Sequence, residues 1–110
     1  MITVTVYRPN GLYTGFSAEG HADYADAGYD IFCAAVSVLT IHTANAIEAL
    51  AGDEIAEEKS EDGFLTCRFA KPLSHEGTLF MDAMVNSLQA IAEGEGKPYV
   101  RCLIKEEVKC

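Results

Sequence analysis

Two side chains suited to nucleophilic catalysis stand in the first third of the sequence, the imidazole of His21 and the thiol of Cys33. A thiolate is a strong nucleophile, and a neighbouring imidazole accepts the thiol proton and then stabilises the sulfur anion as imidazolium. His21 lies in residues 20–22 (Gly-His-Ala) and Cys33 in residues 30–37 (Asp-Ile-Phe-Cys-Ala-Ala-Val-Ser). If folding brings the two side chains together, these residue types fit amide hydrolysis through an acyl-enzyme.

The residues around Cys33 predict a helix that would activate its thiol. Asp30 is a good N-cap, and the apolar residues 31–41 predict a buried helix that runs to residue 50 or 51, with Gly52 as its stop. Cys33 would then lie in the first turn, where unpaired backbone N–H groups and the helix dipole favour a thiolate. The same N–H groups would hold the oxyanion of a tetrahedral intermediate.

Gly20, Asp30 and Ser37 are the supporting candidates of this site. Ser37 lies one turn beyond Cys33 on the same helix face, within reach for a hydrogen bond in the site. Asp30 is first a cap and second a candidate to orient His21 or contact substrate. Each residue also has an ordinary structural role, such as a small buried thiol or a histidine bonded to the backbone at a strand end. The residues alone leave an enzyme and a non-enzyme about equally favoured.

The rest of the chain predicts an α/β (α+β) fold of one domain, residues 1–110, in the order ββ-α-ββ-α-β. Alternating apolar residues and turn signals predict a mostly antiparallel sheet, covered by two helices. The predicted strands span residues 2–7, 12–19, 55–59, 64–69 and 99–104, and the second helix begins after Ser74 and ends at Gly94 and Gly96. Residues 22–28 are small and polar, without periodicity, and are expected to form a mobile loop.

The charge and composition of the chain disfavour several classes of binding partner. The net charge of -9, with 17 acidic and 8 basic residues, disfavours nucleic acid and anionic membranes and favours a basic peptide or protein. Uninterrupted apolar residues never approach the length of a membrane span, and the first residues lack a targeting signal. Four cysteines without a Cys-x-x-Cys pair fit reduced thiols, so a cytoplasmic location is expected.

The sequence does not favour a metal or an organic cofactor. His21, His42 and His75 lie far apart, and none forms a pair with a cysteine at metal-ligand spacing. No glycine motif of the phosphate-binding kind precedes a helix. Cys67 and Cys102 fall in predicted strands and are interpreted as core residues, and Cys110, the last residue, as a stray thiol. No cofactor and no metal are therefore expected.

Residues 20–22 and 28–37 resemble the ribosomal-processing cysteine protease family of bacteria. The family pattern is Gly-His-Ala, a variable loop, and Gly-x-Asp-Ile-x-Cys-Ala-Ala-Val-Ser, and every fixed position is present here. The resemblance extends over nearly the whole chain. Phe32 stands where a smaller aliphatic residue is common, a difference that concerns packing.

The resemblance implies that His21 and Cys33 form a catalytic dyad in a homodimeric protein with a two-helix α/β fold. It implies a substrate, the N-terminal extension of a large-subunit ribosomal protein, and a loop over residues 22–28 that moves to admit peptide. The alternative is a non-catalytic ribosome-assembly or peptide-binding adaptor in which Cys33 is merely packed. A redox sensor is a third hypothesis, disfavoured because no resolving cysteine lies nearby in the sequence.

Overall fold

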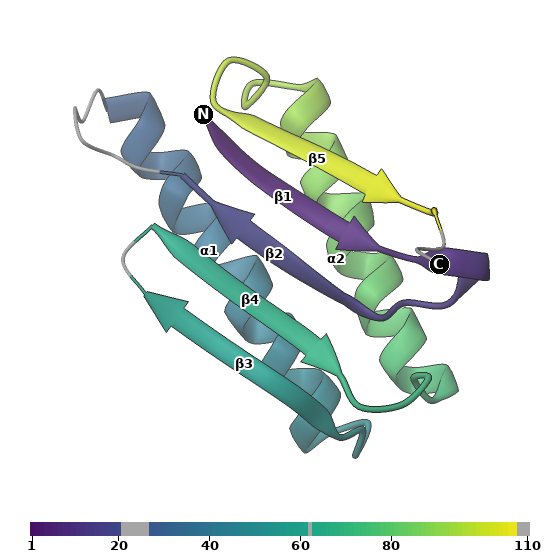
Figure 1. Ribbon diagram of the computed structural model, residues 1–110. Coiled ribbons are helices and arrows are strands. Elements are labelled where there is room, and N and C mark those ends of the chain that lie inside the picture. The colour runs from purple at the N-terminus through teal and green to yellow at the C-terminus, as the bar shows by residue number, and fades with distance from the viewer. Residues whose placement is uncertain (21–26, 62, 108–110) are drawn as a thin grey trace.

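The computed structural model describes residues 1–20, 27–61 and 63–107, with the backbone alone for 27–30 (Figure 1). The elements follow the predicted order ββ-α-ββ-α-β, with a short 3-10 turn in the first hairpin. They are β1 (Ile2–Tyr7), η1 (Pro9–Gly11), β2 (Gly15–Glu19), α1 (Ala27–Ala49), β3 (Ile55–Glu61), β4 (Phe64–Phe69), α2 (His75–Glu93) and β5 (Val100–Lys105).

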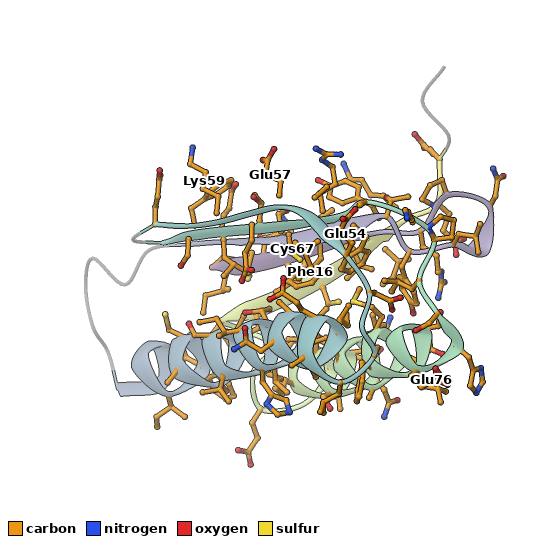
Figure 2. The ribbon with its side chains drawn as sticks, turned by 90° about the horizontal axis from the view of Figure 1, so that it is seen from below. Phe16, Glu54, Glu57, Lys59, Cys67 and Glu76 are labelled. Carbon is orange, nitrogen blue, oxygen red and sulfur yellow. The ribbon has the colours of Figure 1, made fainter. Side chains whose placement is uncertain are left out.

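The five strands form one mixed sheet in the order β3-β4-β2-β1-β5. Neighbouring strands are antiparallel except for β1 and β5, which are parallel. Both helices lie on one face of the sheet, and Figure 2 shows this two-layer arrangement from the edge. The predicted single domain with a mostly antiparallel sheet under two helices is confirmed.

The core lies between the sheet and the two helices. On β1 the residues Ile2, Val4 and Val6 are buried, whereas Thr3 and Thr5 between them are only half-buried, so alternation along the strand selects the helix-facing side. Large buried side chains from both layers complete the core: Phe16, Ile47, Met81, Met84 and Leu88. Burial of this apolar surface is the main favourable term in folding.

Strong local signals placed several element ends correctly. Ser74 is the N-cap of α2, since its hydroxyl accepts a hydrogen bond from the Gly77 N–H at 3.1 Å. Gly94 is the C-cap of α2, and β4 has the predicted bounds. β2 begins at Gly15 instead of residue 12, because η1 occupies the start of the hairpin and the three residues after it are not in the ladder.

The start of α1 differs from the prediction. The helix begins at Ala27, so Asp30 lies within its first turn instead of capping it, and Cys33 is the seventh helical residue. Once a helix is nucleated, each added residue gains a hydrogen bond, and the small residues at 27 and 28 permit this extension. The predicted placement of Cys33 in the first turn is therefore wrong.

The expectation that α1 is buried is also wrong in part. Val36 and Ile47 are buried in the core, but Ile31 and Val38 remain 64% and 67% exposed. The helix is apolar on its outer face as well as its inner face. This outer face is the largest exposed apolar feature of α1.

Residues Ile31–Ala49 of α1 are long and apolar enough to span a membrane by length and composition, with a mean hydropathy of 1.4. The sequence-based prediction counted uninterrupted apolar residues, whereas this segment qualifies by its average, in which Ser37 and Thr40 are outweighed. In the folded domain Val36 and Ile47 of the segment belong to the core. A third of the segment is buried in the fold, and much of its remaining apolar surface is the exposed outer face of α1.

Candidate active site

An open cleft of about 260 Å³ lies between the N-terminal half of α1 and the adjacent ends of β2, β3 and β4. The helix forms one wall of the cleft, and the sheet forms the other with the first residues of β1. The cleft is lined by residues that include Ile2, Glu19, Gly20, Cys33, Ser37, Thr40, Ile41, Ser60, Glu61 and Phe64. A cleft of this size holds one or two side chains of a peptide.

Cys33, Ser37 and Gly20 all line this cleft, so three of the predicted site residues come together. Cys33 is half-buried and free, and Ser37, one helical turn later, is exposed. The Gly20 N–H donates to the carbonyl oxygen of Gly63 at 2.9 Å, which holds the end of β2 to the start of β4. The chain therefore leaves β2 at the cleft, directly before His21.

His21 lies outside the described residues, and so does the side chain of Asp30. The dyad with Cys33 and the supporting role of Asp30 stay predictions. The expected loop over residues 22–28 falls largely outside the described residues as well, and its last two positions belong to α1.

Because α1 begins at Ala27, the free N–H groups at its start are not those of the turn that carries Cys33. Only the first four N–H groups of a helix lack partners within it, and Cys33 is the seventh residue of α1. Its own N–H is therefore used inside the helix, and helix-start donors lie about one turn away. Among the described residues, the turn that carries Cys33 therefore does not offer the free N–H donors that were expected for an oxyanion hole. The hydroxyl of Ser37 is a donor on the same cleft wall.

The remaining described cysteines have environments that suppress the thiolate. Burial, together with the carboxylates of Glu58 and Glu48, raises the pKa of Cys67 to about 12. Burial also raises the pKa of Cys102. Cys67 is buried between the sheet and the helices, as Figure 2 shows. The interpretation of both as packing residues agrees with these environments.

The sheet side of the cleft includes residues that sequence reasoning missed, namely Glu19, Glu61 and Phe64. Glu19 and Glu61 are the Cα partners of Phe64 on its two sides, so the three side chains form one cross-strand row. Because the adjacent Leu65 faces the core, this row points to the outer face of the sheet, where Glu61 pairs with Lys59 at 3.5 Å. The signal for this row is the strand register, which a single sequence does not display.

Polar groups on the helix wall are largely satisfied by the helix itself. The buried hydroxyl of Thr40 donates to the Val36 carbonyl oxygen at 2.8 Å, so it is a packing group. Among the described residues, no three His, Cys, Asp or Glu side chains gather as metal ligands do. The described chemistry of the cleft is that of one thiol and several hydroxyls.

The family model for cysteine protease Prp matches residues 1–101. This chain belongs to the Prp family of cysteine proteases. Over 98 residues it is 33% identical to the ribosomal processing cysteine protease Prp of Bacillus subtilis, a match that covers 83% of this chain and 87% of the relative.

Solved structures of Prp share the fold. The structure of the essential ribosomal processing protease Prp from Staphylococcus aureus with a substrate peptide matches with a TM-score of 0.85 and 30% identity, covering 96% of this chain and all of that one. A second S. aureus Prp structure, with a covalently linked product peptide, matches with a TM-score of 0.82, 31% identity and the same coverage. This Prp chain is accordingly a peptide hydrolase of the cysteine class.

Proposed function

We propose that this Prp chain is an endopeptidase that removes the N-terminal extension of a large-subunit ribosomal protein, with Cys33 as nucleophile and His21 as general base. The observation that carries the proposal is the position of Cys33, a half-buried thiol in an open cleft beside Gly20 and Ser37. The S. aureus relative binds a substrate peptide, and its relatives are named for ribosomal processing.

In the first step the Cys33 sulfur attacks the scissile carbonyl carbon, and a C–S bond forms while negative charge moves to the oxygen. Ser37 donates a hydrogen bond toward that oxygen from the next helical turn. As the C–N bond breaks, His21 gives the leaving amine the proton that it took from the thiol. Asp30 orients the imidazole or contacts the substrate.

In the second step water hydrolyses the thioester that joins Cys33 to the N-terminal fragment, and the fragment is released. His21 takes a proton from the water and returns one to the sulfur, which restores the free enzyme. The covalently linked product peptide in a S. aureus Prp structure supports a route of this kind.

The net charge of the chain favours a basic substrate. The whole chain carries a net charge of -9, and Glu19 and Glu61 lie at the strand ends beside the cleft. Ribosomal proteins are basic as a class, and opposite charge raises the rate of encounter. We expect the reaction in the cytoplasm, without a cofactor, a membrane or direct contact with nucleic acid.

The test is cleavage of a peptide that spans the N-terminal extension of the same organism's large-subunit ribosomal protein. Cys33→Ala and His21→Ala are each expected to lower kcat/KM by at least about a thousandfold, because the nucleophile and its base act as a unit. Cys102→Ala is the matched control, since it removes another half-buried thiol away from the cleft. Binding without cleavage by the folded native protein would instead establish the adaptor function.

We also propose that the protein is a homodimer that uses the outer face of α1. Ile31, Val38 and Ile41 recur at helical spacing and are 64%, 67% and 43% exposed. Ile41 lines the cleft too, so the apolar face is continuous with the site. A second copy of the same helix is the complementary partner, because a two-fold axis pairs a face with itself.

Light scattering after size exclusion tests the dimer. The native protein should run as a dimer, and Val38→Glu as a folded monomer, since it would bury a charge in the paired face. Leu79→Glu, on α2 and also exposed, is the control that should leave the dimer intact. A native monomer would contradict the proposal.

A further inference from the structure

An aromatic stack joins the helical turn that carries Cys33 to the connection between α2 and β5. The ring of Phe32, the residue before Cys33, stacks on the ring of Tyr99 with a centroid distance of 5.5 Å and an interplanar angle of 18°. Both residues are half-buried and pack against the core. Aromatic pairs in this geometry contribute beyond the area that they bury.

The connection that holds Tyr99 is tightly bonded. The N–H of Tyr99 donates to the Gly96 carbonyl oxygen at 2.8 Å, and the Gly96 N–H donates to the Ile91 carbonyl oxygen at 3.0 Å. A side chain at Gly96 would overlap Ile91 and lie within 3.2 Å of the Phe32 ring, so glycine lets the backbone close against that ring. Phe32 thus packs against a fixed surface.

The same connection also holds a wall of the cleft. The carbonyl oxygen of Tyr99 accepts a hydrogen bond from the Ile2 N–H at 2.8 Å, and Ile2 lines the cleft with Cys33. Tyr99 therefore reaches the nucleophile's helix through its ring and the opposite wall through its backbone. Within one subunit Ile31 and Ala34 beside this turn are exposed, and Phe32 and Cys33 are its side chains that pack against the core.

Successive helical residues point about 100° apart, so Phe32 and Cys33 reach different walls, and the packing of one sets the rotation that aims the other. A rotation of about 15° moves an atom about 5 Å from the helix axis by roughly 1.3 Å. Misplacement of a reacting atom by about 1 Å can lower a rate about a hundredfold.

We propose that Phe32 and Tyr99 are positioning residues of the protease, and that their stack sets the rotation of α1 that aims the Cys33 sulfur into the cleft. The inference rests on the proposed role of Cys33. Neither residue is a catalytic residue, because each acts through the helix that carries the nucleophile.

Steady-state cleavage by Phe32→Leu, Tyr99→Leu and the double variant tests this role. Each single change should lower kcat at least about fivefold and leave KM within about twofold, because neither residue lines the cleft. The double variant should have about the same kcat as either single variant, because one substitution alone already removes the stack. Tyr99→Phe keeps the ring and should restore kcat.

Phe69→Leu is the matched control, because Phe69 pairs with Phe16 in the core at 6.3 Å, at the other end of β4 from the cleft. It should lower the unfolding temperature without changing kcat. All variants are assayed well below their unfolding temperatures. Should Tyr99→Leu fail to fold, Phe32→Leu, with its aliphatic replacement, decides the matter alone.

Native kcat in folded Phe32→Leu, or losses that multiply in the double variant, would overturn the positioning role. Those outcomes leave the proposed function standing as long as native cleavage depends on Cys33. Cleavage that persists in Cys33→Ala would instead overturn the proposed function itself.

Discussion

The two ends of the sheet are built differently. At the end away from the cleft, polar side chains from separate segments bond to one another. Tyr13 donates to the Asp82 carboxylate at 2.5 Å, and Arg8 lies over the Tyr13 ring and donates to Glu106 at 2.6 Å. At the cleft end, the described side-chain hydrogen bonds are those of Thr40 to its own helix.

A second cluster strengthens the far end. The Asp53 carboxylate, after α1, accepts from the Ser74 hydroxyl at 2.8 Å and from the Ser74 N–H, at the start of α2. A carboxylate at a helix N-terminus is favourable for the dipole. The comparison teaches that, among the residues that the structure describes, the side-chain hydrogen bonds between separate elements are concentrated away from the cleft.

The largest expected difference between the two ends concerns thiol reactivity. Cys33 should react with iodoacetamide at pH 7.5 at least about a hundredfold faster than Cys67, whose raised pKa of about 12 leaves almost no thiolate. Mass mapping of each cysteine against time measures the ratio. Equal, slow rates for all cysteines would show that the cleft end holds no activated thiol.

Ser37→Ala should lower kcat by about tenfold to a hundredfold, because it removes the hydroxyl donor on the cleft wall while the thiol remains. Its KM and unfolding temperature should stay close to native, since Ser37 is exposed. Thr40→Ser is the control, because it keeps a hydroxyl that bonds within the helix. Unchanged kcat in Ser37→Ala would mean that the oxyanion is held by other groups.

At the far end, Gly77→Ala should lower the free energy of unfolding by about 1–3 kcal/mol. Gly77 is buried, and an added methyl group would overlap the Asp53 carboxylate. Urea unfolding measures the change, and kcat should remain native because the cleft is untouched. A loss of activity without a loss of stability would contradict the prediction that this end of the sheet serves stability and not catalysis.

Tyr13→Phe should cost about 1 kcal/mol, the usual net contribution of one hydrogen bond, and leave cleavage unchanged. It deletes the hydroxyl that donates to Asp82 and keeps the ring beneath Arg8. Tyr7→Phe, at an exposed tyrosine near the same end, is the control for a general effect of hydroxyl removal. A larger loss of stability in Tyr7→Phe than in Tyr13→Phe would contradict the stabilising role of the Tyr13–Asp82 hydrogen bond.

The last expected effect, which is absent at neutral pH, is a decline of stability in alkali. Because the pKa of Cys67 rises from 9.0 to about 12 on folding, the unfolded chain loses this proton first, and stability falls between those pH values. The raised pKa of Tyr13 acts in the same direction above pH 10.0. Cys67→Ala should flatten the decline, although its stability near neutral pH is lower. An equally steep decline in that variant would exclude the thiol as a cause.

The sequence predicted elements whose signals are local. Ser74 as a cap and residues 64–69 as a strand need only their neighbours in sequence. The start of α1 was missed because Asp30 is a strong cap signal, while the gain from extending the helix outweighs it.

The candidate site was predicted in its residues more than in its setting. Cys33, Ser37 and Gly20 do line one cleft. The cross-strand row of Glu19, Phe64 and Glu61 depends on strand register, and the exposed face of α1 depends on which side of an apolar helix the fold covers. Neither is encoded in a local pattern, so both required the structure.

The most direct test of the central claim is the mass of the covalent intermediate. The native protein is mixed with the extension peptide, quenched in acid within the first turnover, and mapped by mass spectrometry. We predict a thioester adduct of the N-terminal fragment on Cys33. Cleavage that proceeds with an adduct on another cysteine, or with full activity in Cys33→Ala, would contradict the account.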